Sequence, residues 1–339
     1  MTGSGVVQTY RGPRAPMDLG TTLIHEHIFV RNPELELSLS FPEWNETAMV
    51  DRAVDSLVAL HSLGIRTVVD LTVPGLGRDV RLVGRVAERV PVNLIAATGW
   101  YGAAGLPAYF EFNGPDRLVG GPDPFIELFV RDIEVGIGGT DVRAGMIKVM
   151  SGPAGITPDV ERVMTAAAVA HRQTGVSITT HSHPASRIGL QQQAFLGAHG
   201  VALDRLIIGH SGDTEDLGYL RELMDNGSTI GMDRFGMEHV LDDGRRLQTV
   251  LALLEFGYAD RMLLSHDAAV YSHVTPPSWR ARVDPNWHME NLPRRVLPLL
   301  REAGVSQAKI DQMLVSNPKR LLEPLPREAG GDRATEEVP

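Results

Sequence analysis

The feature that most constrains this chain is an eightfold alternation of short apolar segments with segments of helical periodicity. The apolar runs are Thr22–Val30, Ile65–Val73, Asn93–Trp100, Ala144–Met150, Val176–Ser182, Arg205–Ser211, Ser228–Arg234 and Arg261–Asp267. Most of them are continuously apolar, which is typical of parallel strands buried on both faces. Eight strand–helix units over about 250 residues predict an α/β fold of the TIM (β/α)8 barrel type. No glycine-rich phosphate loop follows the first strand, which argues against a doubly wound open sheet.

One predicted helix follows each strand. The helices are expected at Glu46–Leu63, Arg81–Arg89, Pro124–Gly136, Asp159–Gln173, Arg187–Ala198, Asp216–Met224, Arg246–Glu255 and Met289–Arg301. Thr157-Pro158 supplies an N-cap and first-turn pair for the fourth of them, and Gly175 lies where a C-terminal left-handed glycine belongs. C-terminal helical additions are expected at Ser306–Val315 and Pro318–Leu322. We therefore expect a single domain over residues 1–326 and a polar, disordered tail over 327–339.

Charge and residue usage exclude several classes of function. The chain has 32 Lys and Arg against 42 Asp and Glu, a net charge of −10, which disfavours nucleic acid as a partner. It has no cysteine, which excludes disulfides, thiolate zinc sites, iron–sulfur clusters and a cysteine nucleophile. Met1–Gln8 has no signal-peptide pattern, and no apolar run approaches the roughly 20 residues needed to span a bilayer. We expect a cytoplasmic protein with no membrane partner.

Histidines lie at the predicted carboxyl ends of the strands, where the active sites of such barrels are found. His25 and His27 are two residues apart on the first strand, so both face the barrel interior, whereas Glu26 faces away. The fifth, sixth and eighth strands end in His181, His210 and Asp267. Hydrogen-bonded core histidines would explain His25-x-His27 alone, but four histidines and an aspartate at one end of a barrel indicate a metal site. Zn, Mn, Co and Fe all accept such ligands.

Lys148 lies inside the predicted fourth strand, among apolar residues. Burial disfavours a charged amine, so its pKa should fall and the amine should become nucleophilic. It could be a Schiff-base lysine, a general base or a site that captures CO2 as a carbamate, or it could pair with a core carboxylate. Beside the histidines and the aspartate, a carbamate would supply an anionic, two-oxygen bridge between two metals.

The ordered set of these residues resembles the phosphotriesterase family of the amidohydrolase superfamily, over about residues 7–322. The strings that carry the resemblance are Leu23-Ile24-His25-Glu26-His27, Ile208-Gly209-His210-Ser211-Gly212-Asp213-Thr214, Gly231-Met232-Asp233-Arg234-Phe235-Gly236 and Ser265-His266-Asp267. They look most like the phosphotriesterase-like lactonases, including the quorum-quenching enzymes that open N-acyl-homoserine lactones.

The resemblance implies a binuclear centre of two divalent ions, which could be Zn, Co, Mn or Fe. His25, His27 and Asp267 would hold the more buried ion. His181 and His210 would hold the more exposed one, and carboxylated Lys148 and a hydroxide would bridge the two. Tyr101 matches an aromatic residue beside the hydroxide, and Arg234 matches an arginine of the lactonase branch that lies near the substrate. A homodimer is also implied.

The implied function is metal-dependent hydrolysis of lactone rings, N-acyl-homoserine lactones above all. Asp267 would take the proton of the attacking hydroxide and pass it to the leaving alkoxide, and organophosphate triesterase activity could accompany the lactonase activity. One alternative is a dedicated phosphotriesterase acting on paraoxon-type substrates, because the same hydroxide can attack carbon or phosphorus. The other is a catalytically silent, ligand-binding barrel, which the complete ligand set argues against.

Overall fold

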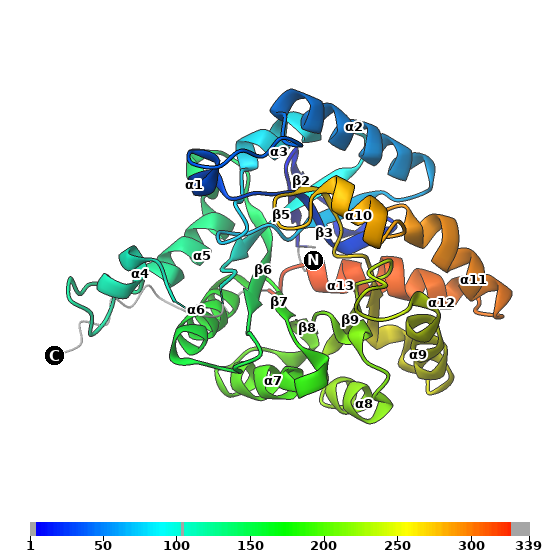
Figure 1. Ribbon diagram of the computed structural model, residues 1–339. Coiled ribbons are helices and arrows are strands. Elements are labelled where there is room, and N and C mark those ends of the chain that lie inside the picture. Colours follow the sequence, from blue (N-terminus) through cyan, green and yellow to red (C-terminus); the bar gives the residue numbers. More distant parts are fainter. Residues whose placement is uncertain (1–4, 103–104, 327–339) are drawn as a thin grey trace.

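Parallel strands form the wall of a barrel, and helices surround it (Figure 1). The computed structural model describes residues 5–102 and 105–326, and the tail predicted over 327–339 lies outside them. In chain order the wall strands are β3 (Thr22–Val30), β4 (Thr67–Asp70), β5 (Asn93–Gly99), β6 (Ala144–Met150), β7 (Ile178–His181), β8 (Leu206–Ile208), β9 (Thr229–Met232) and β10 (Met262–Leu264). Each pairs in parallel with the next, and β11 (Ala269–Ser272) pairs in parallel with β3. The predicted (β/α)8 barrel is confirmed.

The barrel closes between β3 and the residues that follow β10. The Asp267 amide donates to the His25 carbonyl at 3.0 Å, and the His27 amide donates to the Ala268 carbonyl at 2.9 Å. The Ser265 hydroxyl accepts from the His25 amide at 3.1 Å. The closing seam therefore runs through three of the predicted metal ligands and fixes their backbone positions relative to one another.

Helices cover the outside of the wall (Figure 1). Their bounds are α1 (Pro33–Glu36), α2 (Glu46–Ser62), α3 (Val80–Ala87), α4 (Ala108–Phe112), α5 (Pro124–Glu134), α6 (Pro158–Thr174), α7 (Ile188–Ala198), α8 (Leu217–Asp225), α9 (Asp243–Glu255), α10 (Pro277–Val283), α11 (Leu297–Glu302), α12 (Gln307–Asp311) and α13 (Asn317–Leu322). As predicted, Thr157 caps α6 through the Val160 amide, and Gly175 ends it with φ of +74°. An antiparallel hairpin of β1 (Val7–Thr9) and β2 (Gly12–Arg14) precedes the barrel. Within the described ranges, no helix is long and apolar enough to cross a membrane.

Apolar side chains fill the barrel below the site. One cluster joins residues of six strands, Ile24, Val69, Ile95, Met146, Ile207 and Leu263, all of them buried. Side chains from six strands of a barrel can meet only in its interior. Lys148 follows Met146 by two residues on β6, so it continues the same inward face toward the carboxyl ends of the strands.

Candidate metal centre

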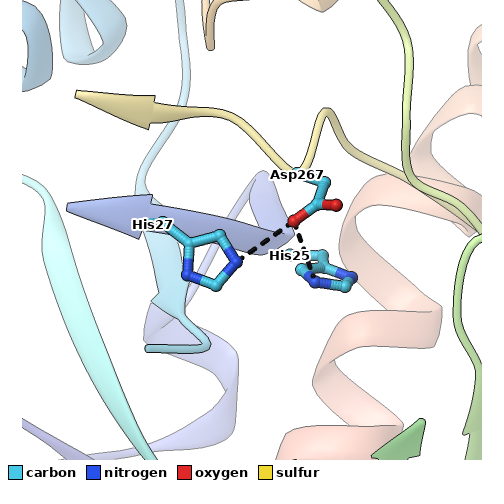
Figure 2. Close-up of side chains that lie close together, drawn as sticks. All are labelled: His25, His27 and Asp267. Carbon is cyan, nitrogen blue, oxygen red and sulfur yellow. Dashed lines mark hydrogen bonds and ion pairs between the residues drawn. The ribbon is translucent and has the colours of Figure 1, made fainter. Parts of the chain in front are cut away.

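Figure 2 shows the side chains of His25 and His27, on β3, and of Asp267, after β10, directed toward one another. Asp267 Oδ1 lies 3.1 Å from His27 Nε2 and 3.4 Å from His25 Nε2. The side chains of both histidines are at most 8% exposed, and that of Asp267 is 14% exposed. These three residues form a group whose donor atoms could hold one metal ion.

The other predicted ligands join this group. Lys148 Nζ lies 3.1 Å from His25 Nε2. The rings of His25 and His210 are 4.9 Å apart between centroids, and His210 Nε2 lies 2.9 Å from His181 Nδ1. The ring of Tyr101 meets that of His181 edge-on at 5.5 Å. The structure thus brings together all six residues predicted to bind metal, with Tyr101 at the His181 side.

Arg234 lies on the Asp267 side of the cluster, directly after β9. Its Nε donates to Asp267 Oδ2 at 3.0 Å, and its Nη1 donates to Asp213 Oδ2 at 2.8 Å. Arg246, which is fully buried, donates to the other oxygen of Asp213 at 2.8 Å. Burial disfavours the charged Arg234, but Asp267 and Asp213 outweigh it and raise the pKa of Arg234. Arg234 is therefore a fixed cation beside Asp267.

Asp233 contacts two of the predicted ligands, although no role was predicted for it from the sequence. Its Oδ2 lies 2.7 Å from His25 Nδ1, and its Oδ1 lies 3.1 Å from His210 Nδ1 and accepts the His210 amide at 2.8 Å. His25, His210 and Asp233 also form a group that could hold a metal. We assign Asp233 to orientation instead, because these are hydrogen-bond distances and a carboxylate can only accept. Both Nδ1 atoms must then carry hydrogen, which leaves both Nε2 lone pairs for a metal.

A second chain of hydrogen bonds fixes His27. The Thr72 hydroxyl donates to buried Asp70 at 2.6 Å, so its oxygen accepts from His27 Nδ1 at 2.9 Å. This leaves the His27 Nε2 lone pair facing Asp267. Neither Thr72 nor Asp70 was predicted from the sequence. Their signal was position, since Asp70 ends β4 and Thr72 follows it at the carboxyl edge of the barrel.

Glu26 has the opposite environment, as its place on the strand predicts. Its Oε1 accepts from the Ser265 hydroxyl at 2.8 Å and from His266 Nδ1 at 2.6 Å, and its Oε2 accepts from the Ala268 amide at 3.0 Å. None of these partners is a predicted metal ligand. Glu26 and His266 therefore hold the closing seam together.

Burial keeps three histidines of the centre neutral, namely His25, His181 and His210. It lowers the pKa of His25, and together with nearby Arg234 it lowers the pKa values of His181 and His210 well below the usual range. Burial likewise lowers the pKa of Lys148, to about 8. Burial by itself would raise the pKa of Asp267. The nearby His25, His210 and Arg234 outweigh burial and hold the pKa of Asp267 well below its usual range. The centre thus presents three neutral imidazoles and an ionised carboxylate.

Comparison with known proteins shows the family to which this chain belongs. The sequence profile of the Phosphotriesterase family matches residues 5–322. The chain belongs to the phosphotriesterase family. A family relative named Phosphotriesterase homology protein, from Mycobacterium tuberculosis, is 42% identical over 319 residues, which are 94% of this chain and 97% of the relative. An aryldialkylphosphatase from Saccharolobus solfataricus is 36% identical over 308 residues, 90% of this chain and 95% of that one.

A solved structure supports the same family assignment. The structure of the phosphotriesterase from Mycobacterium tuberculosis matches with a TM-score of 0.91 at 42% identity, over 94% of this chain and 98% of that chain. The predicted membership of the phosphotriesterase family is therefore confirmed by sequence and by fold.

The donor set of this phosphotriesterase-family chain fits a metal ion. Asp233 and the Thr72–Asp70 pair place hydrogen on the Nδ1 atoms of His25 and His27, so both Nε2 atoms are acceptors. Asp267 Oδ1, a third acceptor, lies 3.4 Å from His25 Nε2 and 3.1 Å from His27 Nε2. Acceptors that face one another in a buried site repel unless a cation lies between them. Imidazole and carboxylate ligands suit Zn, Mn, Co and Fe.

Proposed function

We propose that the protein is a binuclear metal-dependent lactonase that hydrolyses lactone rings, N-acyl-homoserine lactones above all. The observation that carries this proposal is the position of Arg234 and Tyr101 at two sides of the ligand cluster, against Asp267 and His181. An acyl-homoserine lactone offers ester and amide oxygens as acceptors, and a permanent cation and a phenol are donors that suit them.

The chain's side chains divide into two metal positions in this proposal. His25, His27 and Asp267 would hold the more buried ion, and His181 and His210 the more exposed one. Lys148, 1% exposed and 3.1 Å from His25 Nε2, would bridge them as a carbamate. When bound, the metal pair would supply activation of water at neutral pH and polarisation of the substrate carbonyl.

The protein's own groups would then orient the substrate and move protons. Asp267 is ionised at neutral pH and held by Arg234, so it can accept the proton released during attack and pass it to the leaving alkoxide. Burial and the nearby Asp267 raise the pKa of Tyr101, so its hydroxyl stays protonated and can donate to the developing oxyanion. Arg234 stays charged throughout, so it orients the substrate and does not react.

The test is metal-dependent turnover of a small panel by wild type and by Asp267→Asn. The panel contains short- and long-chain acyl-homoserine lactones, a γ- or δ-lactone and paraoxon. We expect efficient lactone opening that is lost on chelation and in the variant. Weak activity on every lactone with both metals bound would refute the lactonase assignment and leave the metal centre intact. Binding of lactone without ring opening would indicate a silent barrel.

A second candidate function is a dedicated phosphotriesterase. The observation that favours it is the 36% identity to an aryldialkylphosphatase over 90% of this chain. The same water-activating centre would serve attack at phosphorus, so the ligand set is common to both candidates. A kcat/KM for paraoxon above that for every lactone tested would replace the lactonase by this candidate.

A further inference from the structure

A pocket of about 410 Å³ lies outside the barrel wall, between α2, β11 and the segment from α10 to residue 294. Both α2 and α10 pack against β11. The pocket's size lies within the roughly 300–1,000 Å³ of small-molecule sites. Among the described residues that line it, none is one of the eight residues predicted for the active site. Its floor includes Val270, Trp287 and Met289, which are all buried.

Arg280, on α10, is the buried cation of this pocket. The residue is 6% exposed, and its guanidinium lies 5.6 Å from the centre of the Trp287 ring. Its two Nη atoms donate to the carbonyls of Ala269 and Val270, on β11. Within residues 5–102 and 105–326, nothing accepts a hydrogen bond from its buried Nε. Burial and the nearby Arg52 lower the pKa of Arg280 to about 10.

The carboxylates around the pocket are engaged by other donors. Glu43 accepts from the amide and the hydroxyl of Ser278 at 3.0 and 2.6 Å. Asp284 accepts from the amide and Nδ1 of His239. Glu290 accepts from Arg294, one turn further along the chain. In the part of the chain that the structure describes, no carboxylate lies within ion-pair distance of Arg280 or Arg52, and Glu43 only partly offsets the effect of burial on the pKa of Arg280.

A buried guanidinium without a carboxylate partner is unfavourable unless an anion reaches it. The pocket supplies the space for one, and the exposed Arg52, on α2, supplies a second cation at its edge. Guanidinium groups pair with the planar oxygens of carboxylate and phosphate groups. The apolar floor suits a hydrocarbon body attached to such a head.

We propose that this pocket binds an amphiphilic organic anion, whose carboxylate or phosphate head pairs with Arg280 and Arg52 and whose apolar tail packs on Val270, Trp287 and Met289. The site is separate from the hydrolytic centre, and its existence does not depend on the proposed lactonase activity.

The test is calorimetric titration of the metal-loaded, full-length protein with octanoate and with octyl phosphate. The neutral control is 1-octanol, and the head-only controls are acetate and inorganic phosphate. Arg280→Met removes the buried cation but also its bonds to β11, so it could fail to fold. Two further variants avoid this: Arg52→Ala removes the exposed cation, and Ala281→Trp fills the pocket from α10. Arg282→Ala, an exposed arginine two residues beyond Arg280, is the matched control.

We expect saturable binding of at least one amphiphile, weakened at least tenfold by Arg52→Ala, abolished by Ala281→Trp and changed less than twofold by Arg282→Ala. Hydrolytic activity should stay at the wild-type level in all three variants. The tighter of the two amphiphiles identifies the head group. The proposal is overturned if neither amphiphile binds, if Arg52→Ala and Ala281→Trp bind as wild type does, or if 1-octanol or the head-only anions bind equally well.

Discussion

Replacing Asp233 by Asn should disable one of the predicted metal ligands, His25. The Oδ1 position of Asp233 receives two donors, the amide and Nδ1 of His210, whereas Oδ2 receives only His25 Nδ1. The amide oxygen of Asn should therefore take the Oδ1 position, which turns its NH2 group toward His25. His25 must then accept at Nδ1, so its hydrogen moves to Nε2, the atom that faces Lys148 and Asp267.

The magnitude follows from the bond that is lost. His25 Nδ1 and Asp233 Oδ2 are 2.7 Å apart and buried, and a hydrogen bond to a charged group contributes about 1.5–3 kcal/mol. At about 1.4 kcal/mol for each factor of ten, this corresponds to a loss of about tenfold to a hundredfold in metal affinity. The same range is typical for removal of a partner that orients a metal-bound histidine.

The assay is metal content of the purified variant, with metal titration and kcat/KM on the best lactone. Glu26→Gln is the matched control, because Glu26 is also a buried carboxylate that binds the amide and Nδ1 of one histidine, His266. We expect a similar loss of stability in both variants and a loss of metal in Asp233→Asn alone. Wild-type metal affinity in Asp233→Asn, or an equal loss in Glu26→Gln, would refute the assignment of Asp233 to orientation.

Four further predictions follow from the same contacts. His181→Ala should lose one metal per chain and reduce turnover by more than about a hundredfold; full kcat with one metal per chain would contradict a two-metal mechanism. Thr72→Val should weaken metal binding about tenfold and, by leaving Asp70 short of a donor, lower the free energy of unfolding by about 1–3 kcal/mol in urea titrations. Because only the neutral amine reacts with CO2 and the pKa of Lys148 is about 8, activation of metal-free protein by metal at a fixed concentration of dissolved CO2 should accelerate as the pH rises toward 8 and level off above it; a pH-independent rate at fixed CO2 would contradict the carbamate. Light scattering should give a mass of twice 36.9 kDa, and a monomer would contradict the homodimer that we propose.

The fold was predictable wherever one strand or helix carries its own pattern. β3 and β6 have the predicted bounds, because nine and seven consecutive residues are buried there. α6 was bounded by its own caps, Thr157 and Gly175. β11 was missed because it is a four-residue strand that forms only by pairing with β3. The short hairpin of β1 and β2 was missed for the same reason, since each strand is three residues long.

For the site, the candidate ligands could be predicted from the sequence, but their hydrogen-bond partners could not. The six predicted ligands could be found because strand ends in a barrel converge, so spacing along the chain implies proximity in space. Their partners could not be found this way. Thr72, whose hydroxyl donates to Asp70, reaches His27 from beyond the end of the neighbouring strand, and which histidine nitrogen it binds depends on side-chain geometry that no spacing encodes.

Two of the predicted ligands adopt backbone conformations that are uncommon for residues other than glycine. His210 and Asp267 have φ of +58° and +54°, in the left-handed region, each just past the end of a strand. Such a residue costs about 1–3 kcal/mol and persists only where its surroundings fix it. Here the His210 amide is held by Asp233 Oδ1 at 2.8 Å, and the Asp267 amide is held by the His25 carbonyl at 3.0 Å. The hydrogen bond that holds the Asp267 backbone is thus part of the seam that closes the barrel. The hydrogen bond that holds the His210 backbone comes from Asp233, the carboxylate that also orients His25. Asp233 therefore contributes both to the backbone turn of His210 and to the side-chain orientation of His25.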